Sequence, residues 1–175
     1  MEIHPTELPE VLTIQPVLRE DDRGWFMETF NAAEFASHGI PTDFLQDNHS
    51  CSRLGVVRGL HYQFDPPQGK LVRCVRGRVF DVAVDIRRES PNFGKWISRE
   101  LSSENQLMLW IPAGFAHGFA ALTDNAEVAY KCTALWNSKG EGTILWNDPA
   151  IGIAWPVSNP IVSAKDAAGA PLVAP

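Results

Sequence analysis

The chain has 175 residues, enough for one domain with a substantial hydrophobic core. It carries 15 basic and 21 acidic side chains, so its net charge is −6. This charge argues against binding nucleic acid through a general positive field, and an anionic small ligand would need a local basic pocket.

The three cysteines, Cys51, Cys74 and Cys132, are an odd number and are not closely paired along the sequence. This spacing argues against a disulfide framework and favours a reducing compartment. The residues after Met1 lack the basic and then apolar pattern of a signal peptide, and no apolar run approaches membrane-spanning length. We therefore expect a cytoplasmic protein with no membrane partner.

The first forty residues predict two short strands, a turn and one helix. The acidic pair before Arg23 and Gly24 is a turn signal. Asn31 and Glu34 have the spacing of a capping box, so a helix is expected to begin after Asn31 and to end at Gly39. The expected elements are a strand at 11–18, a turn at 21–24, a strand at 25–30 and a helix at 32–38.

Beyond Pro41 the sequence indicates a series of short strands separated by turns. The clearest is 78–87, where alternating apolar residues oppose Asp81 and Asp85, a pattern typical of a half-buried strand. Strands and helices do not alternate, so we expect a sandwich or barrel. The small, apolar tail from Ala167 is expected to be loosely ordered. The polar segment 46–53 is either an exposed loop or a strand facing a wet cavity. The other expected strands are 70–75, 95–101, 107–111, 115–122 and 127–136.

Residues 58–63 and the segment that follows the next turn bring together groups that can do chemistry. His61 is the side chain most easily poised as a base near neutral pH. Arg58, Lys70 and Arg73 can hold an anionic substrate or stabilise a developing oxyanion. The alternative is a strand pair with ordinary surface charges, which the concentration of these groups disfavours.

Tyr130 is a candidate acid, and the alternative is a packing tyrosine whose buried hydroxyl makes one hydrogen bond. If Tyr130 and His61 face one cavity, a base can take a proton beside a ketone while Lys70 stabilises the enolate oxygen. A proton returned to the opposite face inverts the carbon, and no redox cofactor is required. The carboxylate that orients the histidine stays open at this point among Asp47, Asp65, Asp81, Asp85 and Asp166.

Several motifs, in order along nearly the whole chain from about Asp22 to Asp166, resemble the dTDP-4-dehydrorhamnose 3,5-epimerase family. They are Gln46–Ser50, Arg58–Gln63, Gln68–Arg73, Ile111–Phe119 and Trp146–Pro149. The resemblance implies an all-β, cupin-type jelly-roll sandwich with one or two short helices, formed as a single domain over 1–175. It also implies a dTDP-sugar substrate held in the mouth of the sandwich, with neither a metal nor another cofactor.

The same resemblance assigns roles in catalysis and binding. His61 would be the base, Tyr130 the acid and Lys70 the oxyanion cation, and Asp166 in Ser-Ala-Lys-Asp would pair with His61. The implied activity is inversion at C3 and C5 of dTDP-4-dehydro-6-deoxyglucose. A homodimer is expected, in which the segment near Arg23 and Glu28 reaches the partner's site. The implied substrate-binding residues are Arg23, Glu28, Gln46, Asn48, Arg58, His117, Glu141 and Lys165.

Two local features depart from simple expectations. Arg58 and His61 differ in strand parity, so a flat strand would turn them to opposite faces. Either Gly59 hosts a bulge between them, or Arg58 points to the mouth of the site or to a neighbouring subunit. Where family members commonly carry a tyrosine pair, this chain has 134–137, with Trp136 keeping only an aromatic face.

Three alternatives remain open. The loss of phenol hydroxyls at 134–137 makes a 3-epimerase of a related deoxysugar conceivable. A non-catalytic nucleotide-sugar-binding cupin would bind ligand without proton exchange. A metal site built from His49, His61 and His117 is the rival chemistry, although the chain has no closely spaced histidine pair.

Overall fold

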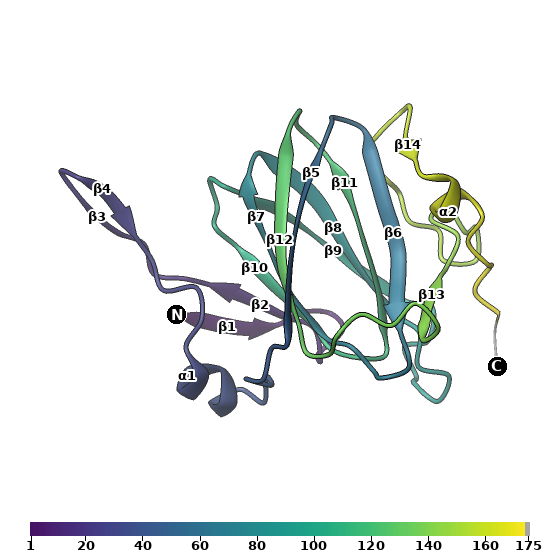
Figure 1. Ribbon diagram of the computed structural model, residues 1–175, viewed down its shortest axis with the longest axis horizontal. Coiled ribbons are helices and arrows are strands. Elements are labelled where there is room, and N and C mark those ends of the chain that lie inside the picture. The colour runs from purple at the N-terminus through teal and green to yellow at the C-terminus, as the bar shows by residue number, and fades with distance from the viewer. Residues whose placement is uncertain (174–175) are drawn as a thin grey trace.

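The computed structural model describes residues 1–173, which form two facing β-sheets, a separate β-hairpin and two short helices (Figure 1). The first sheet is antiparallel, with the strand order β1-β2-β10-β7-β12-β5. Its strands are β1 (Glu2–Pro5), β2 (Leu12–Gln15), β10 (Met108–Ile111), β7 (Lys70–Arg76), β12 (Ala126–Cys132) and β5 (Gln46–Ser52).

The second sheet has the order β13-β6-β11-β8-β9, and β14 adds to β6 in parallel. The hairpin of β3 and β4 stands apart from both sheets and projects from the body of the molecule (Figure 1). These elements are β13 (Glu141–Thr143), β6 (Val56–Gln63), β11 (Phe115–Ala121), β8 (Arg78–Asp85), β9 (Trp96–Ser102), β14 (Ile161–Val162), β3 (Arg19–Asp21) and β4 (Gly24–Phe26).

The main core lies between the two sheets and closes one end of the sandwich. Val72 and Val128 from the first sheet pack with Val79, Ala83 and Phe119 from the second. Because side chains alternate along a strand, the even-numbered residues of β7 point into this space, and Lys70 points the same way as Val72. The predicted β-sandwich is confirmed, and Lys70 is directed to its interior.

Helix α1 (Ala32–Ser37) covers the outer face of the first sheet. The Asn31 side chain accepts hydrogen bonds from the N–H groups of Ala33 and Glu34, which caps the helix as predicted. Phe35 is fully buried and packs in a cluster with Leu71 and other apolar residues of that face. The second helix, α2 (Ala164–Ala167), lies beside β14 and the outer edge of β6 (Figure 1).

The strand prediction at 78–87 was right in position and wrong in environment. Asp81 and Asp85 are both fully buried, so β8 is covered on both faces rather than half-buried. One face meets the core between the sheets, and the other meets a second apolar cluster around Ile144 and Ile151. Alternation reveals which residues share a face, but it does not reveal what covers that face.

Other predicted boundaries also shift. The strand expected at 25–30 ends at Phe26, within a short hairpin, and the strand expected at 11–18 is confined to β2. The predicted loose tail is wrong for residues 167–172, because Leu145 N–H donates to the Ala170 carbonyl and Leu172 N–H donates to Asp148. Residues 174 and 175 lie outside the described part of the chain. Within residues 1–173, no helix is long and apolar enough to cross a membrane.

Candidate active site

A cavity of about 660 Å³ opens between the sheets, at the end of the sandwich not filled by the apolar core. It gathers side chains from β5, β6, β7, β12 and β13 and from the loop after β12. Six of the residues predicted for the site lie in its wall. The lining consists of Gln46, Asn48, His61, Tyr62, Gln63, Gln68, Lys70, Tyr130, Leu135, Trp136 and Glu141.

His61 on β6 is held by a buried carboxylate. Its Nε2 lies 2.5 Å from Oδ1 of Asp166, and the other oxygen accepts from Gly59 N–H at 3.4 Å. Burial tends to raise the pKa of Asp166, but the hydrogen bonds and charge of its partners bring that pKa below its ordinary value. Asp166 is therefore an ionised acceptor, so Nε2 carries the proton and Nδ1 is left to accept one.

The local sequence places Asp166 beside β6. Ser163 caps α2 by accepting a hydrogen bond from the Asp166 N–H at 3.1 Å, which makes the short helix begin there. Strand β14 pairs in parallel with the start of β6, with Ile161 opposite Val56. Together the strand pairing and the cap direct the Asp166 carboxylate to His61. Asp166 is thus the one of the five sequence candidates that contacts His61.

A bulge at Gly59 accounts for the different strand parity of Arg58 and His61. The pairing of β6 with β11 shifts register between His61 and Arg58, so the predicted bulge is confirmed. The φ angle of Gly59 is +125°, and a Cβ there would lie 2.5 Å from the Cα of Gly118. Only glycine satisfies both constraints.

Arg58 is anchored on the neighbouring sheet. Its Nε donates to Ser52 Oγ at 3.0 Å and its Nη2 donates to the Cys51 carbonyl at 3.2 Å, both at the end of β5. These two hydrogen bonds hold its positive charge in a fixed place at the end of β5. That charge opposes the rise that burial causes in the Tyr130 pKa.

Lys70 and Tyr130 provide a buried cation and a buried phenol. Lys70 Nζ donates to the His61 carbonyl at 3.2 Å, and burial lowers the pKa of this ammonium. Burial raises the pKa of Tyr130, and Cys132 reinforces that rise. The phenol therefore keeps its proton at neutral pH, while burial shields the Lys70 amino group from water and disfavours its charged form.

The mouth of the cavity carries Glu141, Lys165 and Trp136. Glu141 accepts from Lys165 Nζ at 2.7 Å and from Trp136 Nε1 at 3.0 Å. Burial tends to raise the pKa of Glu141, and the bonds from Lys165 and Trp136 outweigh it and lower that pKa. Strand β12 ends at Cys132, so the predicted strand to residue 136 is wrong and Trp136 belongs to a loop.

His117 lies on β11 directly opposite His61. Its Nε2 bonds to Asp81 at 2.9 and 3.0 Å, and its ring centroid lies 6.5 Å from that of Tyr130. His49, by contrast, bonds to Glu127. The three-histidine metal site is therefore not assembled, since each ring has its own carboxylate. Within residues 1–173, no cluster of three or more His, Cys, Asp or Glu residues is arranged to hold a metal ion.

Arg23 and Glu28 do not reach this cavity within the chain. Arg23 lies at the tip of the projecting hairpin and pairs with Asp21 at 2.5 Å (Figure 1). Glu28 lines a small separate hollow with Phe26. Arg73, which the sequence offered as a third cation for the substrate, is also absent from the cavity wall, because its position on β7 turns it to the outer face.

Comparison with known proteins agrees with this geometry. The family model for dTDP-4-dehydrorhamnose 3,5-epimerase matches residues 5–173. The chain belongs to this family. A dTDP-4-dehydrorhamnose 3,5-epimerase of Shigella flexneri is 54% identical over 175 residues, spanning 99% of this chain and 97% of the relative.

Solved structures of the epimerase family superpose closely. The 3,5-epimerase RmlC of Legionella pneumophila, in complex with dTDP-4-keto-L-rhamnose, is 47% identical with a TM-score of 0.95, covering 98% of this chain and 92% of that one. ChmJ, a 3′-monoepimerase of Streptomyces bikiniensis in complex with dTDP-quinovose, is 34% identical with a TM-score of 0.92, covering 97% and 87%. These neighbours confirm the predicted cupin-type epimerase fold.

Two glutamines of the epimerase motifs support the mouth and were given no role by the sequence. Gln63 donates to the Leu135 carbonyl and accepts from Asn137 N–H, and Gln68 donates to the Ala134 carbonyl. They fix the loop that carries Trp136. Their position inside the motifs Arg58–Gln63 and Gln68–Arg73 could have identified them from the sequence as residues of the site. Asp81 was missed as the partner of His117, because its strand pattern suggested an exposed face.

Proposed function

We propose that this protein is an isomerase that inverts C3 and C5 of dTDP-4-dehydro-6-deoxyglucose and forms dTDP-4-dehydro-L-rhamnose. One observation carries the proposal. A histidine oriented by a buried carboxylate shares a cavity with a protonated tyrosine and a buried lysine. This set of groups suits proton removal and return beside a ketone.

In the proposed reaction, Nδ1 of His61 takes the proton from the carbon next to the C4 ketone. The electron pair of the broken C–H bond forms the enolate, and the ammonium of Lys70 stabilises its oxygen. Tyr130 then gives its phenol proton to the opposite face of the same carbon, and solvent later restores both groups. The carbon is inverted with no change in oxidation state, so no redox cofactor takes part.

Other residues, some in the cavity wall and some bonded or packed beside it, are proposed to bind the nucleotide sugar. Gln46 and Asn48 carry amides on the inner face of β5. Arg58 offers a planar guanidinium suited to a diphosphate. His117, Glu141 and Lys165 complete the proposed contacts to the substrate.

We also propose a single-domain homodimer that works in the cytoplasm. The projecting hairpin supports the dimer, because it exposes Trp25 and Phe26 beside Arg23 and thus presents apolar and charged surface to another chain. In that dimer Arg23 and Glu28 would contact the substrate of the partner subunit. The three free cysteine thiols are compatible with a reducing compartment.

A single inversion is the second candidate. The observation that favours it is Trp136, which stands where family members commonly carry a tyrosine and uses its only side-chain donor on Glu141. A 3-epimerase would release product inverted at one carbon. A non-catalytic binding protein would give no exchange at either carbon.

The test is incubation with dTDP-4-dehydro-6-deoxyglucose in heavy water, followed by NMR of the sugar ring. Deuterium at both C3 and C5 with inverted couplings supports the 3,5-epimerase. Deuterium and inversion at C3 alone would establish the 3-epimerase instead. Binding without deuterium incorporation would reject both enzymatic functions.

A further inference from the structure

The molecule contains a second histidine–carboxylate pair next to the first. His61 and His117 are directly opposite residues on β6 and β11, and Asp81 lies on β8, the next strand of the same sheet (Figure 1). Nε2 of His117 lies 3.0 Å from Oδ1 and 2.9 Å from Oδ2 of Asp81. The sheet thus holds two imidazole rings side by side, each tied through Nε2 to its own carboxylate.

The surroundings of the Asp81 carboxylate link it to His117. The Asp81 side chain is fully inaccessible to solvent, and within residues 1–173 the ring of His117 is its only hydrogen-bond partner. Burying a carboxylate is costly unless it is paired and hydrogen-bonded. Asp85, on the same strand and equally buried, is instead bonded to Arg87 and Ser90 in a network away from the cavity. The two aspartates therefore serve different parts of the molecule.

The other ring nitrogen of His117 is open. Within residues 1–173, Nδ1 has no hydrogen-bond partner. It is nevertheless not among the fully buried side-chain polar atoms that lack a partner, since Ser50 Oγ is the only such atom in these residues. Nδ1 is therefore not sealed off, and although His117 is not in the wall of the 660 Å³ cavity, it packs against Tyr130, which is. The ring stands at 63° to that of Tyr130, with the centroids 6.5 Å apart, so it lies beside the proposed acid.

We propose that Asp81 is a positioning residue that fixes the His117 ring through Nε2, so that Nδ1 meets the sugar beside Tyr130. The inference rests on the proposed function, since it assumes that the sugar lies between His61 and Tyr130. Two rings locked on adjacent strands then contact the sugar at two points, His61 at the reacting carbon and His117 at a polar group. Misplacing a substrate by about 1 Å can cost on the order of 10²-fold in rate. The contribution of Asp81 should appear in kcat more than in KM.

The test is a double-mutant cycle with Asp81→Asn and His117→Ala, assayed by deuterium incorporation into the sugar. We expect Asp81→Asn to lower kcat roughly 10- to 100-fold in the wild-type background and to cause no further loss in the His117→Ala background. Asp85→Asn is the matched control, because it also places an amide on the buried face of β8. It should lower the melting temperature and leave kcat unchanged.

An equal loss of kcat from Asp81→Asn in both backgrounds would overturn the inference, because Asp81 would then act independently of His117. A kcat unchanged in Asp81→Asn would overturn it as well. If Asp81→Asn does not fold, ¹⁵N NMR of the wild-type His117 ring decides. A proton fixed on Nε2 and a change at Nδ1 on adding dTDP-glucose support the inference, and a ring insensitive to ligand refutes it. If the wild-type enzyme shows no turnover, the proposed function fails, and the NMR experiment still tests the ring.

Discussion

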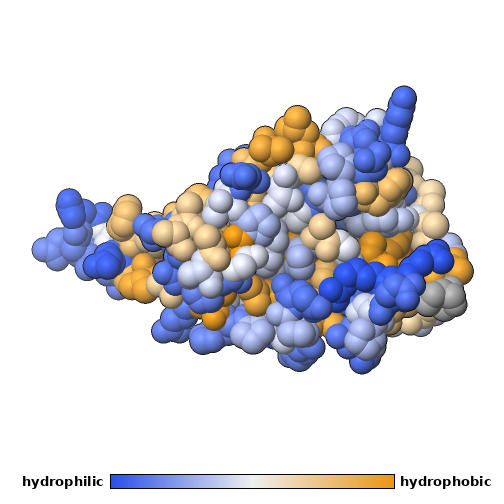
Figure 2. Space-filling view, turned by 90° about the horizontal axis from the view of Figure 1, so that it is seen from below, coloured by the Kyte–Doolittle hydropathy of each residue, from blue (hydrophilic) through white to orange (hydrophobic). Residues whose placement is uncertain are grey.

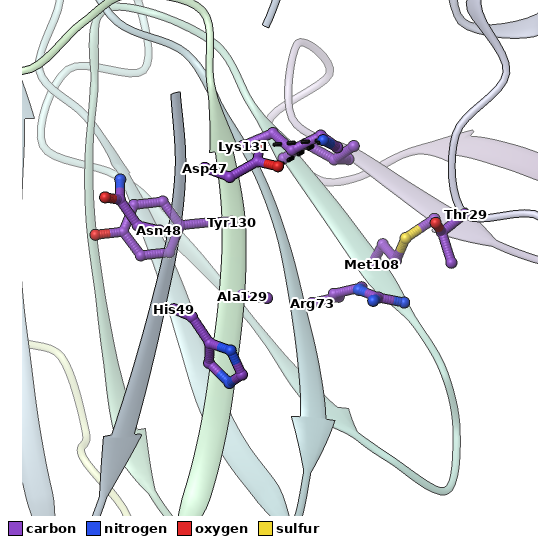
Figure 3. Close-up of a pocket in the computed structure, with 10 residues that line it drawn as sticks. Thr29, Asp47, Asn48, His49, Arg73, Met108, Ala129, Tyr130 and Lys131 are labelled. Carbon is purple, nitrogen blue, oxygen red and sulfur yellow. Dashed lines mark hydrogen bonds and ion pairs between the residues drawn. The ribbon is translucent and has the colours of Figure 1, made fainter. Parts of the chain in front are cut away.

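The two faces of one sheet carry similar side chains in different physical settings. On the inner face, β5, β7 and β12 contribute Asn48, Lys70 and Tyr130 to the candidate active site. On the outer face, the same strands line a cavity of about 430 Å³ with His49, Arg73 and Lys131, among others. In Figure 3, Tyr130 and Asn48 point to one side of the sheet, whereas Arg73, Met108 and Thr29 lie on the other. Each cavity therefore has a histidine and a cation within reach.

The difference lies in burial and orientation. Outside, Lys131 pairs with Asp47 at 3.0 Å, and His49 pairs with Glu127 at 3.1 Å, where water screens the charges. Inside, burial lowers the pKa of Lys70 and raises that of Tyr130, and buried Asp166 orients His61. Catalytic potential follows from removing water around the charges and fixing the base, rather than from the residue types alone.

The sharpest test of this contrast is to remove one histidine from each region. His61→Ala should lower kcat roughly 10²- to 10⁴-fold, the usual contribution of a general base. Deuterium incorporation next to the ketone, measured by NMR, should fall by at least the same factor. His49→Ala, on the outer face, should leave the exchange rate unchanged. Deuterium wash-in at the wild-type rate in His61→Ala would refute His61 as the base.

The next largest effect should come from Lys70. Lys70→Met should lower kcat on the order of 10²- to 10³-fold, because the enolate oxygen loses its cation. Since burial lowers the pKa of Lys70, wild-type kcat should fall with rising pH below the ordinary lysine value of about 10.4. The Tyr130 pKa is shifted upward, so its phenol should not cause this fall.

The pH profile of kcat distinguishes these two groups. Lys70→Arg should move the alkaline fall to higher pH, since a guanidinium stays charged there. Tyr130→Phe should reduce kcat while the alkaline fall stays at the wild-type pH. If the fall moved with Tyr130→Phe and not with Lys70→Arg, the roles of the two residues would have to be exchanged.

A smaller effect is expected at Arg58, which is anchored to β5 at the edge of the site. Arg58→Ala should raise the Kd for dTDP about 10- to 100-fold, because hydrogen bonds to charged groups contribute about 1.5–3 kcal/mol each. Isothermal titration calorimetry measures this directly. Arg53→Ala, an exposed arginine near the same strand end, controls for the loss of one positive charge. An affinity unchanged in Arg58→Ala would reject its diphosphate role.

The smallest effect is expected at Arg73, one of the cations of the outer cavity. Arg73→Ala should leave kcat unchanged and alter the free energy of unfolding by about 0.5 kcal/mol or less, as is usual for surface substitutions. Enzyme assays and thermal unfolding of the purified variant check both values. A large loss of kcat would show that the outer cavity takes part in the reaction, and the contrast between the faces would fail.

Much of this protein could be predicted from sequence because the signals were local. Asn31 caps a helix by accepting hydrogen bonds from N–H groups only two and three residues away. Gly59 lies within the strand that bulges at its position. Alternation along β7 correctly placed Lys70 with Val72 on one face. His61 and Lys70 could be identified as a candidate pair because they lie within two neighbouring motifs.

The partner of His61 and the burial of Asp81 could be known only from the tertiary structure, because local sequence patterns do not determine burial or the pairing of distant residues. Five aspartates were open as partners of His61, and only the pairing of β14 with β6 brings Asp166 within 2.5 Å across 105 residues of chain. The sequence pattern suggested that Asp81 faces solvent, but in the structure apolar side chains cover both faces of β8. Sequence periodicity determines which side chains share a face, whereas the packing of other elements determines whether that face meets water, core or substrate.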